Sequence, residues 1–358
     1  MNVLTSAFWF IVIFGVLVAT HEGGHYFVAR KCGIHVREFW LGIGPNIFKK
    51  QMKNGTLFKL KLVPLGGACV FDDTEEAAKK KHDPSYGEAF YNAALWKRML
   101  TILAGPTLNF VTAAIFALTI TLIAGIDKPI IRNVIEGTPA AEAGIEAGDT
   151  VLAIDGKPVK IYRDFTFERL FDDKKPVTIK GKHKNGEIYE VTITPEFDEE
   201  SGRNLIGVSG GTNSSVAISE VIPYTGAEMN YWFNYMGTFF KMIGNHSIGI
   251  ESMSGPIGIA GFIGNEVQRA AEVSKIQILV TVFRLIVFLS INLGIINLIP
   301  FPGLDGGQFL LLCIEGLRKG KRMKEEHVNQ FNMFGIALLL ILSGYICIQD
   351  VAHIVFGF

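Results

Sequence analysis

Four segments of this chain are apolar over lengths that match the hydrocarbon core of a lipid bilayer. They are residues 7–29, 99–123, 278–299 and 334–356. A core of roughly 30 Å takes about 20 helical residues to cross. Because lipid offers no hydrogen bonds, a spanning backbone must satisfy its own polar groups, as a helix does. The sequence therefore predicts a polytopic α-helical membrane protein with four transmembrane helices.

Basic residues gather in two of the connections between these segments. Residues 30–98 are rich in Lys and Arg, including the run Lys79-Lys80-Lys81, and residues 318–324 carry several more. The positive-inside rule then places both connections in the cytoplasm. The termini and the insert between the second and third segments are expected outside. No small-residue cleavage site follows the first segment, so we expect it to be retained.

The first apolar segment contains the motif His21-Glu-Gly-Gly-His25. On a helix, imidazoles four residues apart project from one face and can bind one metal ion. Glu22 lies beside them and can take a proton from water at that metal. The alternative is a core or signal-anchor helix with a few satisfied polar residues. Ionisable side chains within the bilayer cost free energy, so their presence in an apolar segment favours a functional role. We therefore expect a zinc site.

A catalytic zinc needs a third protein ligand and an open position for water. The candidate is Asp305, in the run Asn297-Leu-Ile-Pro-Phe-Pro-Gly-Leu-Asp305-Gly-Gly307 at the end of the third apolar segment. Pro300 and Pro302 lack amide protons and break a helix. Irregular backbone at membrane depth persists only where it is buried in protein or lines a wet cavity, so Asp305 is expected to point inward. A solvated aspartate in a helix-ending turn is the alternative.

The insert between the second and third segments, residues 128–210, changes to short strands and turns. Residues 177–182 and 188–194 flank Asn185-Gly186, a hairpin signal because this dipeptide suits positive φ. A helix is expected at 162–171 and a final strand at 204–208. The run from Gly137 to Gly156 resembles the PDZ domain of bacterial envelope proteases. Such a domain either adds a peptide to a strand edge, often a free C-terminus, or acts as a steric plug.

Two further features leave alternatives open. Residues 224–243 are aromatic-rich and too polar to span, which fits a helix in the membrane interface or a helix packed on the insert. Cys32 lies seven residues after His25, where it is either ordinary packing, which we favour, or a fourth ligand. The four cysteines are scattered outside the insert, so no disulfide framework is implied.

These motifs together resemble the site-2 protease family of intramembrane zinc metalloproteases, peptidase family M50. They are similar to its regulator-of-sigma-E branch in a form with one PDZ domain. The likeness runs nearly end to end and includes HEGGH at 21–25, Gly105-Pro106 with Asn109-Phe110, the insert, Ser254-Gly-Pro-Ile-Gly-Ile-Ala260 and the run ending in Asp305-Gly-Gly307.

The resemblance implies a zinc ion held by His21, His25 and Asp305, with Glu22 as the catalytic acid and base. It also implies that Asn297 helps to hold the substrate or transition state. Residues 36–71 correspond to the family's membrane-associated β-hairpin, which contacts unwound substrate. Gly23 and Ala68 depart from the residues usual in the family, a larger apolar residue and a tyrosine. Neither is a ligand position, so these departures bear only on substrate fit.

The resulting expectation is a zinc metalloendopeptidase that cuts peptide bonds within or near the spans of single-pass membrane proteins. Substrates would be an anti-sigma factor already trimmed by an upstream protease, or signal-peptide remnants. An inactive membrane-anchored PDZ scaffold is the main alternative; a metal transporter is less favoured because His and acidic residues do not recur along several spans. Beyond the substrate, we expect the bilayer as a partner and no nucleic acid.

The expected location is a bacterial cytoplasmic membrane, with the active site opening toward the cytoplasm. Four parts are expected along the chain. Residues 1–124 carry the first two spans, HExxH and the hairpin, and residues 128–210 form the PDZ domain. Residues 211–275 are an extracytoplasmic interfacial segment, and residues 276–358 carry the last two spans with the Asp305 motif.

Overall fold

A computed structural model describes residues 3–79, 83–171, 174–199, 203–214, 217–249 and 254–356. Lys80 and Lys81 of the basic connection lie outside these ranges. The chain forms two compact units. One combines Met1–Phe116 with Lys241–Phe358, and the other is Ala117–Phe240.

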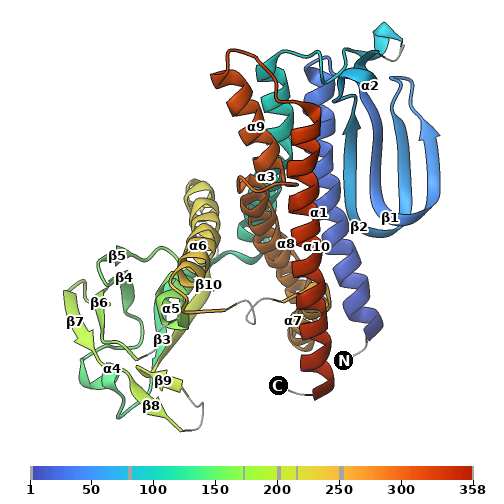
Figure 1. The fold of residues 1–358 in the computed structure, drawn as a ribbon. Helices are drawn as coiled ribbons and strands as arrows, with labels where there is room; N and C mark the ends of the chain where they lie inside the picture. Colours follow the sequence, from blue (N-terminus) through green and yellow to red (C-terminus); the bar gives the residue numbers. More distant parts are fainter. Residues whose placement is uncertain are drawn as a thin grey trace. The chain divides into compact units, whose positions relative to one another are not determined.

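The described residues include four helices that are long and apolar enough to cross a membrane, as the hydropathy pattern predicts (Figure 1). They are α1 (Val3–Lys31), α3 (Leu95–Ala124), α8 (Lys275–Leu298) and α10 (Glu325–Phe356). The first unit also holds α7 (Pro256–Val273), α9 (Asp305–Leu317), and the short α2 (Glu75–Lys79) and η1 (Pro84–Tyr86).

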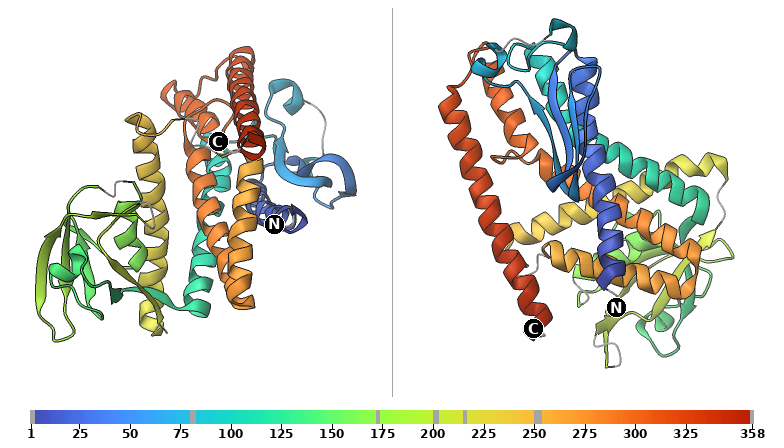
Figure 2. Two further views of the ribbon diagram at one scale, coloured as in Figure 1. Left: turned by 90° about the horizontal axis from the view of Figure 1, so that it is seen from below. Right: turned by 90° about the vertical axis from the view of Figure 1, so that its right-hand side faces the viewer.

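The core of the first unit forms where α1, α7 and α8 pack together. Ile13 and Leu17 of α1 meet Ile263 of α7 and Ile286 of α8 in one apolar cluster. Helix α10 attaches to this group through Asp350, whose Oδ1 accepts from Gly255 N at 3.1 Å and whose Oδ2 accepts from Gly258 N at 2.8 Å. The carboxylate thus caps the first turn of α7, where backbone N–H groups have no helical partner. Figure 2 shows α7 and α10 from two further directions.

The segment that was expected as a hairpin is more folded than a simple pair of strands. In β1 (Val36–Gln51) and β2 (Leu57–Phe71), residues 38–41 pair on one side with 67–70 and on the other with 57–60. Residues 48–51 then pair with 57–60, so that two bent strands make a four-stranded layer. Gly42 and Gly66, at φ +87° and +75°, permit the bends. The layer packs against α1.

The second unit contains a sheet with the order β10-β3-β4-β6-β7, in which β5 also pairs with β4. The strands are β3 (Ile126–Val134), β4 (Thr150–Ile154), β5 (Lys157–Pro158), β6 (Val177–Lys182), β7 (Ile188–Ile193) and β10 (Val208–Ser214). The short α4 (Pro139–Glu142) and α5 (Tyr162–Phe171) and the pair β8 (Glu196–Asp198) and β9 (Arg203–Leu205) complete it.

Apolar side chains of these elements form a conventional core, including Ile131, Val151, Ile154, Phe165 and Ile179. The expected helix at 162–171 and the hairpin around Asn185-Gly186 are found. The single strand expected at 204–208 is wrong. Gly207, at φ +85°, separates β9 from β10, and β10 continues to Ser214 alongside β3.

Helix α6 (Ile218–Gly244) covers the aromatic-rich residues 224–243. Its Ala227 and Tyr231 join Ile161 and Phe167 in a buried cluster, and Glu228 forms a bidentate pair with Arg163 of α5. The structure therefore supports the second of the two alternatives, a helix packed on the insert.

Candidate metal centre

Two helices supply the side chains predicted to bind metal. His21 and His25 are one turn apart on α1, and Asp305 is the first residue of α9. Helix α8 ends at Leu298, and the prolines at 300 and 302 keep residues 299–304 out of a helix, as predicted. Gly306 and Gly307 allow α9 to start directly against this break, since a Cβ at Gly306 would lie 2.3 Å from Ile299 O. The break in α8 thus directs Asp305 toward α1.

The structure brings these three residues together. Asp305 Oδ2 lies 3.2 Å from Nε2 of His21 and 3.2 Å from Nε2 of His25. Ligands of a tetrahedral zinc at about 2.0–2.1 Å lie about 3.3 Å from one another, so this spacing fits zinc. Asp305 Oδ2 is also buried without a hydrogen-bond partner.

The contact on the far side of His25 explains why the three atoms converge. Its Nδ1 lies 2.8 Å from the carbonyl oxygen of Thr101. A carbonyl only accepts, so Nδ1 carries the proton and Nε2 presents a lone pair to Asp305. Two acceptors that face one another in a buried site need a cation between them. The donor set therefore fits a divalent metal.

Asn109 plays the corresponding part for His21 and was not predicted as a functional residue. It entered only as part of a family motif, yet its fully buried side chain lies 3.0 Å from His21 Nδ1. The amide oxygen is buried without a partner. With that oxygen turned to the ring, Asn109 would accept from Nδ1–H and leave the Nε2 lone pair for the metal.

Glycines let α1 and α3 approach closely beside these histidines. A Cβ at Gly24 would lie 2.4 Å from Ala104 O, and a Cβ at Gly105 would lie 2.3 Å from His25 Nε2. Gly23, the departure noted in the sequence, has no such neighbour: a Cβ there would meet only the Phe27 side chain, at 3.7 Å. The close approach therefore depends on Gly24 and Gly105, whereas Gly23 has room for a side chain.

Glu22 lies beside the edge strand of the four-stranded layer, residues 67–71. A Cβ at Gly67 of β2 would be 2.8 Å from Glu22 Cγ, and the backbone of Cys69 hydrogen-bonds to the Glu22 carboxylate. The layer thus touches the side chain expected to act as the base. The signal in the sequence was Gly66-Gly67, but the contact joins residues too far apart in the chain to predict.

Two other positions singled out in the sequence are Asn297 and Cys32. Asn297 is half-buried in the last turn of α8, and among described residues no hydrogen bond or ion pair joins it to His21, His25 or Asp305. Cys32 packs in an apolar cluster with Tyr26 and Phe39, which agrees with its expected packing role.

A second group in the insert, Glu146, Asp149 and His183, also gathers possible metal ligands. It differs from the first because both Asp149 oxygens have donors. Oδ1 lies 3.0 Å from His183 Nδ1, and Oδ2 accepts from Glu146 N at 2.9 Å. Its geometry is that of a hydrogen-bonded cluster.

Comparisons with known proteins give the family of this chain. The model of peptidase family M50 matches residues 9–342. A relative from Clostridium acetobutylicum is 30% identical over 96% of both chains. Zinc metalloprotease RasP of Geobacillus kaustophilus is 29% identical over 98% of this chain and 99% of its own, and regulator of sigma-W protease RasP of Bacillus subtilis is 27% identical over 96% and 98%.

Among solved structures, the PDZ domain of an SdrC-like protein from Listeria innocua is 28% identical over 25% of this chain and all of its own, with a TM-score of 0.21. The family match spans nearly the whole chain and confirms the resemblance drawn from the motifs. The chain is therefore a membrane zinc metalloprotease that belongs to peptidase family M50.

Proposed function

We propose that His21, His25 and Asp305 hold the zinc ion and that Glu22 is the general acid and base of an intramembrane protease. The observation that carries this proposal is the pair of facing acceptors, His25 Nε2 and Asp305 Oδ2, 3.2 Å apart in a buried site. Zinc bound there would supply Lewis acidity at the reacting centre.

The protein residues supply the rest of the chemistry. Glu22 takes a proton from the attacking water and later gives it to the leaving amine, a role for which a carboxylate beside the ligands suffices. Thr101 and Asn109 hold the two imidazoles in one orientation, so that no reorganisation is needed during the reaction. Asn297, at the helix end before the break, would bind the substrate or the developing oxyanion through its amide.

A substrate helix must unwind before its peptide bonds can react, because its carbonyls are already hydrogen-bonded. The layer of β1 and β2 offers a strand edge for this purpose. Its edge strand, residues 67–71, pairs on one side only and is the strand that touches Glu22, so a peptide paired there would lie beside the base. We propose that this layer is membrane-associated and receives substrate as an added strand.

The proposed orientation has the zinc open to the cytoplasm, with the insert and the termini outside a bacterial cytoplasmic membrane. It rests on the Lys and Arg asymmetry of the connections. Within this arrangement the parts 1–124, 128–210 and 276–358 keep the roles expected above. Residues 211–275 do not act as one interfacial segment, because β10 belongs to the sheet of the insert, α6 packs on the insert and α7 packs against α1 and α8. Single-pass membrane proteins are the proposed substrates, with an anti-sigma factor as one candidate because one relative is named a regulator of sigma-W protease.

We propose that the insert is a PDZ domain that acts as a size filter. Because the active site is reached through the membrane, proximity is already supplied, and capture of a C-terminus would add little affinity. Deletion of residues 128–210 with a short linker should then allow cleavage of substrates with large external domains. Slower cleavage of trimmed substrates would instead show capture of new C-termini.

Replacement of Glu22 tests the catalytic assignment. Glu22→Gln should reduce cleavage of a tagged single-pass substrate by about 10²–10⁴-fold while zinc content is retained, because a general base contributes about that much. A scaffold would give the same phenotype with Glu or with Gln at position 22.

The membrane orientation is tested in a protein without native cysteines. An external thiol reagent should label Asn185→Cys and spare Lys324→Cys.

A further inference from the structure

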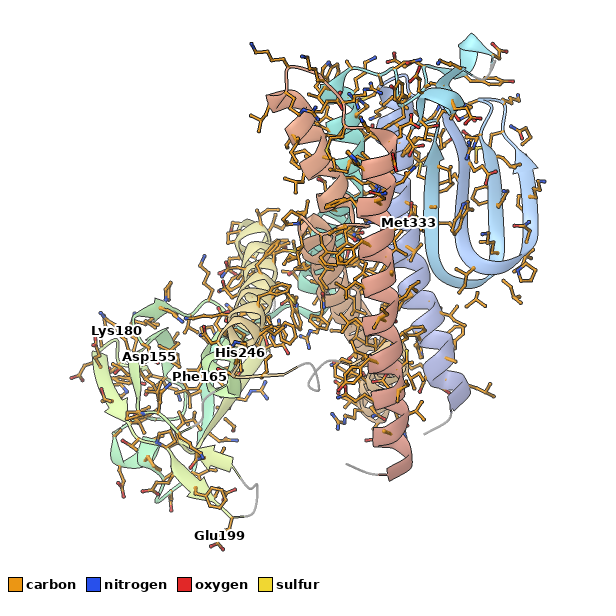
Figure 3. All side chains as sticks on the ribbon, viewed as in Figure 1. Asp155, Phe165, Lys180, Glu199, His246 and Met333 are labelled. Carbon is orange, nitrogen blue, oxygen red and sulfur yellow. The ribbon has the colours of Figure 1, made fainter. Side chains whose placement is uncertain are left out.

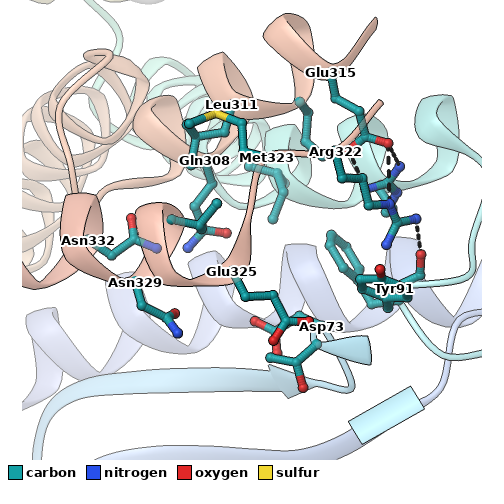
Figure 4. Close-up of a pocket in the computed structure, with 16 residues that line it drawn as sticks. Asp73, Tyr91, Gln308, Leu311, Glu315, Arg322, Met323, Glu325, Asn329 and Asn332 are labelled. Atoms are coloured by element: carbon teal, nitrogen blue, oxygen red, sulfur yellow. Dashed lines mark hydrogen bonds and ion pairs between the residues drawn. The ribbon is translucent and has the colours of Figure 1, made fainter. Parts of the chain in front are cut away.

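A cavity of about 180 Å³ lies in the first unit, between the start of α3, α9 and the start of α10 (Figure 4). Ordinary small-molecule sites occupy roughly 300–1,000 Å³. This cavity is smaller and suits one side chain with its flanking peptide groups. None of its lining residues takes part in the proposed chemistry.

The cavity begins next to the proposed metal centre. Gln308 lines it and lies three residues after Asp305, about 4.5 Å further along α9. Ile102 also lines it and directly follows Thr101, whose carbonyl holds His25. From there the cavity follows α9 to residues 322–325 in the basic connection that is proposed to be cytoplasmic.

Two guanidinium groups on one wall, those of Arg98 and Arg322, share the single carboxylate of Glu315. Arg98 makes a bidentate pair with Glu315, at 2.9 and 2.5 Å, and both are buried. Arg322 lies 3.5 Å from the same carboxylate and stacks 3.7 Å over the Tyr91 ring. Over the whole lining, three carboxylates (Asp73, Glu315 and Glu325) stand against two guanidinium groups, so the cavity carries a net negative charge.

The opposite wall carries two carboxylates, and that of Glu325 accepts a hydrogen bond from Glu75 N at 2.7 Å. Asp73 and Glu325 face the cavity, and among described residues neither makes an ion pair. The nearby bases are used elsewhere, since Arg37 pairs with Asp72 at 3.5 Å and Lys79 with Glu75 at 2.5 Å. The pKa of Asp73 is raised, first by partial burial and then, against the effect of Arg37, by the neighbouring charges of Asp72 and Glu325.

Amide side chains line another part of the same cavity. Gln308 comes from α9, and Asn329 and Asn332 come from the same face of α10. Asn332 Oδ1 is buried without a hydrogen-bond partner. Amides donate and accept at once, which matches the paired N–H and C=O groups of an extended peptide.

We propose that this cavity is a subsite for the substrate segment that leaves the membrane on the cytoplasmic side, and that it selects a Lys or Arg in that segment. Asp73 and Glu325 bind the cationic side chain, and the three amides bind the peptide groups that connect it to the scissile bond. Cytoplasmic flanks of membrane proteins are enriched in Lys and Arg, so the charge is complementary to this substrate class. The inference rests on the proposed active site and orientation.

The test compares two reporter substrates that differ only in their cytoplasmic flank, Lys-Arg or Gln-Gln, with the purified full-length protein in lipid nanodiscs. Wild-type protein should cleave the Lys-Arg substrate with a kcat/KM about fivefold higher, as expected for two partly solvated charge pairs. The double variant Asp73→Asn with Glu325→Gln should lose this preference, so that its kcat/KM values for the two substrates become equal. The matched control, Glu76→Gln with Glu326→Gln, changes two exposed carboxylates outside the cavity and should keep the preference.

Charge reversal, Asp73→Lys with Glu325→Lys, should favour a Glu-Glu flank instead. Equal cleavage of both flanks by the wild type, or a preference that survives in the double variant, overturns the proposal. A photo-crosslinker at Met323 in the Glu22→Gln background should capture the Lys-Arg flank but not the Gln-Gln flank, without any need for catalysis. If the wild type cleaves neither substrate, the proposed function fails, and this crosslink still decides the subsite.

Discussion

The two compact units of this protein differ in which groups they bury beside their functional residues and in what they expose. In the first, buried groups around the metal centre are polar, including His25, Asn109 and Arg98, while α10 exposes large apolar side chains such as Met333 and Ile341, each 70% exposed. In the second, the interior is apolar, and Phe165 lies within it while Asp155 and Lys180 point outward (Figure 3). Lipid removes the hydrophobic driving force between helices, so specific polar partners and close backbone contacts must replace it.

The largest difference between the units is expected when one carboxylate is removed from each group of possible metal ligands. These groups are His21, His25 and Asp305 in the first unit and Glu146, Asp149 and His183 in the second. Asp305→Ala should abolish cleavage and lower zinc from roughly one ion per chain to a small fraction, because two imidazoles alone make an incomplete site. Asp149→Asn in the insert should leave zinc content and cleavage of trimmed substrates unchanged. Elemental analysis and a cleavage assay measure both, and full zinc in Asp305→Ala would remove that residue from the ligand set.

Adjacent glycines test whether close backbone contact replaces apolar burial in the first unit. Gly24→Ala should reduce kcat/KM by about 100-fold, because the added Cβ, 2.4 Å from Ala104 O, would shift α1 and its histidines. Gly23→Ala should change the rate less than about twofold, since it meets only a flexible ring and Ala favours a helix. Equal loss in both variants would show that helix flexibility, and not the approach of α3, sets the geometry.

Buried Arg–Glu pairs occur in both units and sharpen the comparison further. Glu315→Gln should destabilise the protein by about 3–5 kcal/mol, because Arg98 is then buried without a charge partner. Glu228→Gln should cost less, since Arg163 keeps Asp127 at 3.7 Å. Thermal unfolding monitored separately for each unit, through tryptophan or cysteine probes, measures the difference. A larger loss for Glu228→Gln would contradict it.

The smallest expected effect separates core packing from lipid exposure. Ile154→Val in the insert should cost about 0.5–1.5 kcal/mol, because a buried methylene is lost. Ile341→Val on α10 should have no measurable effect, since that side chain has few protein neighbours to lose. Hydrogen exchange of the β4 and β6 amides reports the first change, and thermal unfolding reports the second.

Local patterns explain which parts of the site were predictable. The spacing of His21 and His25 and the helix break before Asp305 are properties of short segments, so the sequence was enough to propose them. Thr101, Asn109 and Gly67 act through contacts between elements that are far apart in the chain, and no periodicity marks such contacts. The bends in β1 and β2 were missed for the same reason, because register depends on which strand each residue meets.

The basic connections show a limit of predicting membrane orientation from the number of Lys and Arg residues. Arg98 contributes to the positive bias that sets the expected orientation, yet its guanidinium is buried and paired with Glu315. A charge count treats it as a solvated cation. Only the position of Glu315 on α9, distant in sequence, reveals that this arginine stabilises the packing of α3 on α9.

The cap that Asp350 places on α7 has a consequence for the order of events during synthesis. The carboxylate lies 95 residues after the Gly255 amide that it accepts from. At about 5–20 residues per second, α7, which ends at Val273, is complete for roughly 4–15 s before its cap is translated. Until then the first turn of α7 lacks this partner for its N–H groups, so the N-terminal end of α7 is completed only when the last helix has been made.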